Sequence, residues 1–151
     1  MEIVEDDLSG EPTRALLALH LAGMQANSPP ESVHALDLSG LQTREVTVWT
    51  VREAGAVIAV GAMRMLGDDT AELKSMRTHP DHLRKGAAAA LLRHMIAVSR
   101  TRGLARLSLE TGSGPAFDPA LALYRAHGFA DGAAFGDYEA SAFNRFLHLA
   151  L

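Results

Sequence analysis

The stretch over residues 76–90 combines the residue types best suited to bind an anionic ligand. It reads MRTHPDHLRKGAAAA, which predicts a strand end, a turn and a helix start in succession. A helix start carries free N–H groups and the positive end of the helix dipole, and both favour a phosphate group. Gly86 and the alanines after it would let a ligand approach the backbone closely, while Arg84 and Lys85 add positive charge. The stretch predicts either a phosphate-binding loop or an ordinary helix N-terminus, and it matches neither the P-loop nor the dinucleotide-binding pattern.

Positive charge is concentrated around this loop. The protein has 151 residues and a formal net charge of −4. Residues 74–106 nevertheless contain eight Lys or Arg residues and one acidic residue. Residues 1–73 contain four Lys or Arg residues and twelve acidic residues. A basic segment in an acidic chain is typical of a solvated helix face or of a site for an anion. The overall negative charge disfavours a general nucleic-acid-binding protein.

The composition excludes several classes of site. The chain has no cysteine, which rules out a disulfide scaffold, a thiolate nucleophile, cysteine-ligated zinc and an iron–sulfur cluster. Hydrophobic residues make up 48% and charged residues 21%, as is typical of one globular domain. No apolar run is long enough to span a membrane, and the acidic first residues differ from a signal peptide. We therefore expect one cytoplasmic domain over residues 1–151.

Two groups of residues around histidines offer alternative chemistry. His34 and Asp37 lie near serines and could form a hydrolase triad, but the Gly-x-Ser-x-Gly elbow of such enzymes is absent. His79 and His82 flank Asp81, but a zinc site needs a further ligand that the sequence does not offer. We expect no metal site, and we expect Asp81 to cap a helix start.

The periodicity of the apolar residues predicts a mixed α/β domain. Alternation predicts strands, and spacings of three to four residues predict helices. The strand–helix–strand unit over residues 70–111 should be a right-handed crossover between parallel strands. The expected strands cover residues 1–6, 45–53, 57–65, 70–78, 104–111, 129–138 and 143–149, and the expected helices cover residues 11–25, 84–102 and 119–126.

Two motifs resemble those of the GNAT superfamily of N-acetyltransferases, which take an acetyl group from acetyl-CoA. The first has the form Pro-x-x-[Arg/Gln]-x-x-Gly-x-[Gly/Ala], and Pro80, Gly86 and Ala88 fit it. Leu83 departs from the usual Arg or Gln, and Arg84 stands where glycine is common. These departures leave unchanged the backbone amides that would hold the CoA pyrophosphate.

The second motif, [Leu/Phe]-Tyr-x-x-x-Gly-Phe, is matched by LYRAHGF over residues 123–129. The two motifs occur in the family's order, and the resemblance extends over roughly residues 45–150. Residues 72–78 and 107–118 are also similar to a YsnE-like branch of bacterial acetyltransferases. The resemblance implies an α/β (α+β) fold: a single domain with a mixed central sheet of six to seven strands, helices on both faces and an acyl-CoA-binding core over roughly residues 70–130.

The same resemblance implies acetyl-CoA as the cosubstrate. Backbone amides of the glycine loop would hold its pyrophosphate, and the pantetheine arm would lie between two diverging parallel strands. The backbone N–H of Met76 would polarise the thioester carbonyl. The residues that the resemblance assigns to acetyl-CoA are Met76, Arg77, Thr78, Arg84, Lys85, Gly86, Ala87, Ala88, Ala89 and Tyr124.

The resemblance also implies catalytic roles. Tyr124 would protonate the departing CoA thiolate, although a tyrosine at this position could instead be packed in the core. Glu72, on the strand before the loop, would deprotonate the incoming amine, and Glu110, at the end of the next parallel strand, is the rival candidate. Because the chain has no cysteine, we expect direct transfer without an acetyl-cysteine intermediate.

The acceptor is expected to be a primary amine of a small molecule or a peptide, and the acidic remainder of the chain favours a cationic amine. The residues expected to contact it are His34, Asp37, Thr111 and Ser113. The alternative function is a non-catalytic acyl-CoA sensor of the same fold, which would need neither Tyr124 nor a carboxylate base. We expect no nucleic-acid or membrane partner, and the resemblance allows a homodimer.

Overall fold

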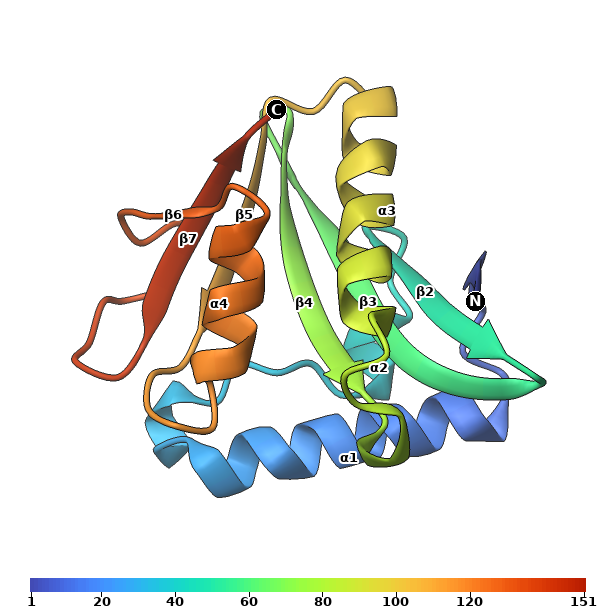
Figure 1. The fold of residues 1–151 in the computed structure, drawn as a ribbon. Coiled ribbons are helices and arrows are strands. Elements are labelled where there is room, and N and C mark those ends of the chain that lie inside the picture. The colour runs from blue at the N-terminus through green and yellow to red at the C-terminus, as the bar shows by residue number, and fades with distance from the viewer.

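A seven-stranded sheet in the order β1-β2-β3-β4-β5-β7-β6 forms the centre of the computed structural model, which describes residues 1–151 (Figure 1). Neighbouring strands are antiparallel except β4 and β5, which are parallel, as the sequence predicted. The strands are β1 (Glu2–Glu5), β2 (Val46–Glu53), β3 (Ala56–Gly67), β4 (Thr70–Thr78), β5 (Arg106–Thr111), β6 (Ala130–Asp131) and β7 (Arg145–Ala150).

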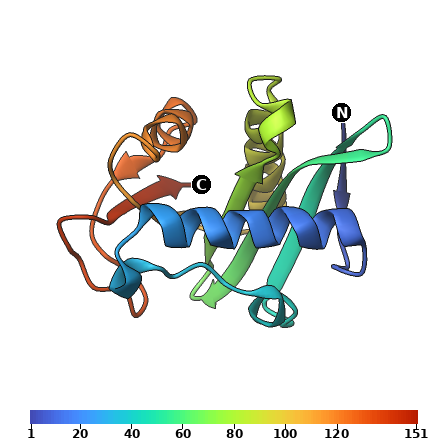
Figure 2. The ribbon, with the colours of Figure 1, turned by 90° about the horizontal axis from the view of Figure 1, so that it is seen from below.

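Helices cover both faces of the sheet, which confirms the expected fold class. They are α1 (Glu11–Asn27), α2 (Leu38–Leu41), α3 (Ala87–Thr101) and α4 (Asp118–Ala126), with short 3-10 turns at Pro30–Ser32 and Pro80–His82. Figure 2 shows α1 on one side of the sheet and α3 and α4 on the other. None of these helices is long and apolar enough to cross a membrane.

Each face of the sheet has its own hydrophobic core. Leu91 and Met95 of α3 are fully buried together with Met63 of β3, because their spacing places them on one side of the helix. On the opposite face, Leu16 of α1 packs with Val60 of β3. Strand β3 thus contributes to both cores: Val60 and Ala62 belong to the core with α1, and Met63 belongs to the core with α3.

A β-bulge in β4 overturns one prediction about the site. Regular alternation along the strand predicted over residues 70–78 places Glu72, Lys74 and Met76 on one face. In the structure, two residues of β4, Ser75 and Met76, lie opposite the single residue Gly61 of β3, and Ser75 adopts a φ of 56°. The extra residue reverses the alternation. Met76 therefore packs against the α3 core, on the face opposite Glu72 and Lys74.

Gly61 makes room for this bulge, and replacing it with alanine should disturb the site. A Cβ at Gly61 would lie 2.5 Å from Met76 Sδ and 3.1 Å from Leu91 Cδ2. We expect Gly61→Ala to lower the free energy of unfolding by about 1–3 kcal/mol, the usual cost of overpacking a core. Urea unfolding monitored by circular dichroism measures the change. An unchanged midpoint would show that Met76 moves aside freely.

Strands β4 and β5 separate at the middle of the sheet. Their pairing ends at Leu73 and Leu109, and beyond that point β5 pairs only with β7. The two strands therefore form a V, which opens toward α1 in Figure 1. The separation was expected from the resemblance, and it leaves the end of β4 without a partner on its β5 side.

Two predicted elements differ from the structure by more than two residues at one end. The helix predicted over residues 84–102 begins only at Ala87, because Arg84 and Gly86 have φ angles of 61° and 85°, which no α-helix accommodates. The strand predicted over residues 129–138 pairs only at Ala130–Asp131. The chain then leaves the sheet and packs Phe135 and Tyr138 against Phe146 of β7. Burial of these aromatic rings replaces the strand pairing that the pattern predicted.

Candidate active site

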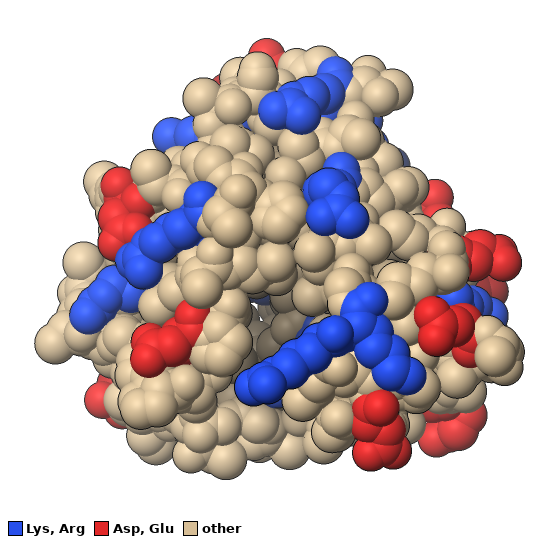
Figure 3. Space-filling view, in the orientation of Figure 1, with Lys and Arg blue, Asp and Glu red and all other residues tan.

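A cavity of about 610 Å³ lies between the start of α3 and α4. Figure 3 shows the hollow on this face, bordered on one side by Lys or Arg side chains. Most of the residues expected to bind acetyl-CoA line it: Met76, Arg77, Thr78, Arg84, Gly86, Ala87, Ala88, Ala89 and Tyr124, together with Ala59, Val60, Leu83, Leu91, Ala116, Pro119, Ala120 and Leu123.

The start of α3 presents free amides to this cavity. No side chain caps the helix, and its first internal hydrogen bond runs from Ala90 N to Gly86 O. The N–H groups of Ala87, Ala88 and Ala89 therefore lack an acceptor within the helix. The left-handed turn at Arg84 and Gly86 exposes them, and a Cβ at Gly86 would meet no atom within 4 Å. Such a loop fits a pyrophosphate, and the apolar walls fit a pantetheine chain.

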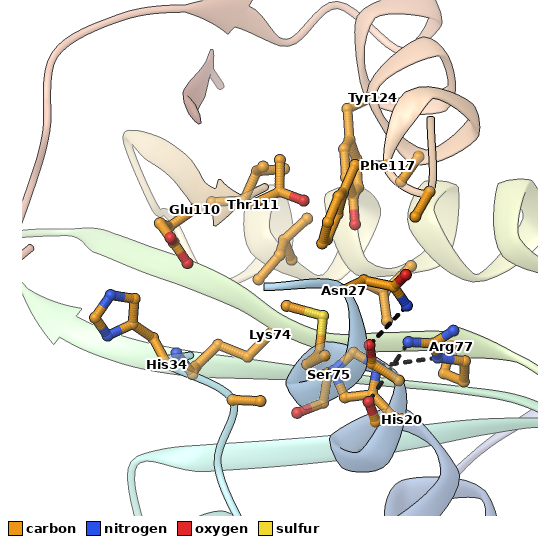
Figure 4. Close-up of a pocket in the computed structure, with 18 of the residues that line it drawn as sticks. His20, Asn27, His34, Lys74, Ser75, Arg77, Glu110, Thr111, Phe117 and Tyr124 are labelled. Atoms are coloured by element: carbon orange, nitrogen blue, oxygen red, sulfur yellow. Dashed lines mark hydrogen bonds between the residues drawn. The ribbon is translucent and has the colours of Figure 1, made fainter. Parts of the chain in front are cut away.

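A second cavity of about 160 Å³ lies where β4 and β5 diverge (Figure 4). Residues of α1, including His20, Gly23 and Asn27, form its floor. Both cavities are lined by Met76, Arg77, Ala116, Ala120 and Tyr124. The remaining residues that line it are Met24, His34, Ala35, Glu72, Leu73, Lys74, Ser75, Leu109, Glu110, Thr111 and Phe117. A molecule in one cavity would thus meet a molecule in the other beside Tyr124.

Tyr124 lies on α4 at this junction and is only 7% exposed. Its hydroxyl points into the cavity in Figure 4. Its ring packs edge-on against Phe129, as the core interpretation predicted, while its position at the junction leaves the predicted functional role open to test. Burial raises the pKa of Tyr124 to about 12, although Arg77 opposes the shift. The phenol therefore keeps its proton at neutral pH and can donate it.

Glu110 reaches the cavity from the end of β5. Its Oε2 is buried without a hydrogen-bond partner. Burial raises the pKa of Glu110 to about 7; the charge of Glu72 adds to the shift and that of Lys74 opposes it. A carboxyl group that titrates near neutral pH can both accept and release a proton there.

Glu72 is engaged by other side chains. It is 2% exposed and forms an ion pair with Lys74, with Nζ and Oε2 3.3 Å apart. The hydroxyl of Tyr138 also donates a hydrogen bond to Glu72 Oε2, and Lys74 Nζ donates to the same hydroxyl at 2.8 Å. Burial raises the pKa of Tyr138, and the charge of Glu72 adds to that shift. Glu72 is thus less free than Glu110 to take a proton from a ligand.

Sequence reasoning missed Tyr138 and His20. Tyr138 lies 66 residues from Glu72, in a segment predicted as a strand, and nothing in the sequence signals their contact. His20 of α1 accepts a hydrogen bond at Nδ1 from Arg77 Nε, 3.1 Å away. Burial lowers the pKa of His20 to about 4, and the charges of Arg77 and Lys74 add to the shift, so this ring is neutral.

Four of the residues singled out in the sequence lie outside both cavities and contact other groups. Asp37 caps α2 by accepting from the N–H of Gly40 and the hydroxyl of Ser39. The Ser113 hydroxyl donates a hydrogen bond to the carbonyl of Phe143 at 2.6 Å, which connects the loop after β5 to the segment just before β7. Lys85 Nζ lies 3.2 Å from His82 Nδ1. Asp81 caps no helix: His79 Nδ1 instead accepts from the Asp81 N–H.

Known proteins are similar in sequence to this chain along most of its length. The sequence profile of the acetyltransferase (GNAT) family matches residues 13–129. The Escherichia coli (strain K12) protein YedL, described as an uncharacterized N-acetyltransferase, is 47% identical over 99% of this chain and 94% of its own. The Bacillus subtilis (strain 168) protein YsnE, described in the same words, is 45% identical over 91% of each chain.

Solved structures share the fold. A Klebsiella pneumoniae protein, named for a proposed acyl-CoA N-acyltransferase activity, has a TM-score of 0.84 at 26% identity and covers 99% of this chain and 97% of its own. A GNAT family acetyltransferase from Elizabethkingia anophelis with acetyl-CoA bound has a TM-score of 0.74 at 15% identity. It covers 99% of this chain and 97% of its own. The family profile and the two relatives show that the chain belongs to the GNAT family of acetyltransferases.

Proposed function

We propose that the protein transfers an acetyl group from acetyl-CoA directly to a primary amine, with both substrates bound together. One observation carries the proposal. The cavity at the uncapped start of α3 and the cavity at the divergence of β4 and β5 meet at Tyr124, with Glu110 on the far side of the junction. This arrangement offers a donor site, an acceptor site, a proton donor and a proton acceptor in that order.

The chain's own residues would hold acetyl-CoA at several points. The N–H groups of Ala87, Ala88 and Ala89 would bind the pyrophosphate, helped by the positive end of the α3 dipole. The unpaired edge of β4 beyond Leu73 would pair with the pantetheine arm as an added strand does, and the Met76 N–H would polarise the thioester carbonyl. Bound acetyl-CoA supplies the activated acetyl group.

Two side chains would move the protons. Glu110 accepts the proton of the incoming amine, because its carboxylate forms near neutral pH and has a free buried oxygen. Tyr124 donates its hydroxyl proton toward the sulfur that leaves. We assign the base role to Glu110 rather than to Glu72, because Lys74 and Tyr138 already occupy Glu72. The negative charge of Glu72 then raises the pKa of Glu110.

The proposal is tested by incubating the protein with acetyl-CoA and a panel of amines and measuring free CoA with a thiol reagent. The chain has no cysteine, so the protein adds no background to the thiol signal. Amine-dependent CoA release, with the acetylated product found by mass spectrometry, is expected. Binding of acetyl-CoA without release for any amine would instead support an acyl-CoA sensor.

Replacing Gly86 by valine should weaken acetyl-CoA binding by about tenfold or more. Its φ of 85° strains any residue with a Cβ by about 1–2 kcal/mol, and the new side chain would project into the cavity. Gly55→Val is the matched control, because Gly55 has a φ of 81° and equally open surroundings in the β2–β3 turn. Isothermal titration with CoA measures both variants. Equal affinities of the two variants would contradict the phosphate-binding role of the loop.

A further inference from the structure

We infer that the acceptor is a free amino acid, whose carboxylate binds Arg77 while its amine faces Glu110. This substrate class rests on the proposed acetyl transfer and goes beyond it. Arg77, at the junction of the two cavities, carries the argument.

The Arg77 guanidinium is held in place by α1 and keeps one edge free. Its Nε donates to His20 Nδ1 at 3.1 Å, and its Nη2 lies 3.5 Å from the His20 carbonyl oxygen. Nη1 has no protein acceptor, so the guanidinium offers a donor to a ligand. Figure 4 shows Arg77 beside His20 on the α1 side of the cavity. Because the His20 ring is neutral, it receives the hydrogen bond without adding a second positive charge.

Gly23 of α1 admits this guanidinium. A Cβ at Gly23 would lie 2.9 Å from Arg77 Nη2 and 3.4 Å from Arg77 Cζ. Glycine lowers the stability of a helix interior, and the φ of Gly23 is not in the left-handed region that would require it. The close approach of Arg77 accounts for a glycine at this position.

Two residues that line the same cavity each have a buried polar atom without a partner. Ser75 lies at the bulge, is 7% exposed and has a buried Oγ without a hydrogen-bond partner. Glu110 Oε2 is likewise buried and unpaired. Buried polar atoms are normally paired, so these atoms indicate a polar ligand. The unpaired donors of Arg77 and Ser75 suit a carboxylate, and the acceptor at Glu110 suits an amine.

Size and charge select a small zwitterion over a peptide or a polyamine. The cavity holds about 160 Å³, which favours a small acceptor. Lys74 is neutralised by its ion pair with Glu72, which leaves Arg77 and Glu110 as the opposite charges of the cavity. A second ammonium group would find no free carboxylate besides Glu110. This inference replaces the cationic amine that the acidic composition suggested.

The test compares acceptors that differ only at the carboxylate. Each of the common amino acids is assayed beside its carboxamide and its decarboxylated amine, and kcat/KM is measured by CoA release. We expect the accepted amino acid to exceed its two analogues by roughly 30-fold, the effect of losing one partner of a buried charge pair. Carboxamides or plain amines that react as well as the acids would overturn the inference.

The variant Arg77→Gln removes the charge and keeps a hydrogen-bonding side chain. It should lower kcat/KM for the amino acid by roughly 30-fold and bring the acid-to-carboxamide ratio close to one. Although Arg77 lines both cavities, its guanidinium lies against His20 and Gly23 of α1, so we expect the Kd of CoA to stay unchanged. The control is Arg93→Gln, because Arg93 is an exposed residue of α3 outside both cavities and should behave as wild type. An equal loss for all acceptors, or a weaker affinity for CoA, would place Arg77 in the cofactor site and overturn the inference.

Binding provides a readout that does not depend on turnover. Saturation-transfer NMR of the same panel with the CoA-loaded protein should detect the amino acid, and Arg77→Gln should abolish its signal. A protein that binds CoA but no amino acid would overturn the acceptor class alone, leaving acetyl transfer in place. A protein that binds neither CoA nor acetyl-CoA would overturn the proposed function, and with it this inference.

Discussion

Replacing Tyr124 by phenylalanine is expected to lower kcat by about 100-fold, the usual contribution of a general acid, without changing the affinity for acetyl-CoA. The hydroxyl stands at the junction of the two cavities, where the leaving sulfur would lie. Phenylalanine keeps the packing against Phe129 and removes only the proton donor. The effect should therefore appear in kcat and not in the Kd of CoA.

The chain's other tyrosine supplies the control for this measurement. Tyr138→Phe removes a hydroxyl that bonds Glu72 and Lys74 but does not line either cavity. Its effect on kcat should be at least tenfold smaller than that of Tyr124→Phe. Steady-state kinetics with saturating amine compares the two variants. If Tyr124→Phe keeps wild-type turnover, another group protonates the leaving thiolate.

Replacing Glu110 by glutamine should lower kcat/KM for the amine by about 100-fold and remove one limb of the pH profile. The base acts only when it is ionised, and the pKa of Glu110 is raised to about 7. In the wild type, kcat/KM should therefore rise about tenfold per pH unit below pH 7 and level off above it. A wild-type pH profile that lacks this limb, or a variant that retains it, would exclude Glu110 as the base.

Comparing Glu72→Gln with Glu110→Gln shows which of the two carboxylates is the base. It removes a negative charge that raises the pKa of Glu110, so the rising limb should move to lower pH while turnover at high pH persists. If Glu72 is instead the base, its variant loses activity at every pH and the Glu110 variant does not.

Glu110→Gln should also change the stability of the folded protein in a pH-dependent way. The pKa of Glu110 lies above its ordinary value of 4.5 in the folded chain, so between these values the native state binds the proton more strongly than the unfolded state does. The native state therefore loses stability as the pH rises through that window. Glu110→Gln should raise Tm at pH 8 and have little effect at pH 4, as thermal unfolding at the two pH values would show.

The residues that we propose bind acetyl-CoA could be singled out from the sequence because they lie in local motifs. The glycine loop, the alanine-rich helix and the Tyr-x-x-x-Gly-Phe motif each depend on residues close together in the chain. Backbone amides at a helix start bind an anion whatever the distant residues are, so Leu83 and Arg84 could depart from the usual pattern without obscuring the site. The parallel crossover followed from the same local periodicities.

The acceptor side depended on contacts that no local pattern records. The bulge at Ser75 moved Met76 to the other face because one extra residue reverses strand alternation. The choice between Glu72 and Glu110 followed from Tyr138, which reaches β4 from a segment whose alternation had predicted a strand. The position of the Arg77 guanidinium depends on contacts with His20 and Gly23, which lie more than fifty residues earlier in the chain. The sequence by itself determined the family and located the glycine loop that we propose binds phosphate, because both depend on neighbouring residues. Only the tertiary structure decided which carboxylate has an unpaired oxygen and which cation lines the cavity proposed for the acceptor, because burial and pairing arise between segments distant in the chain.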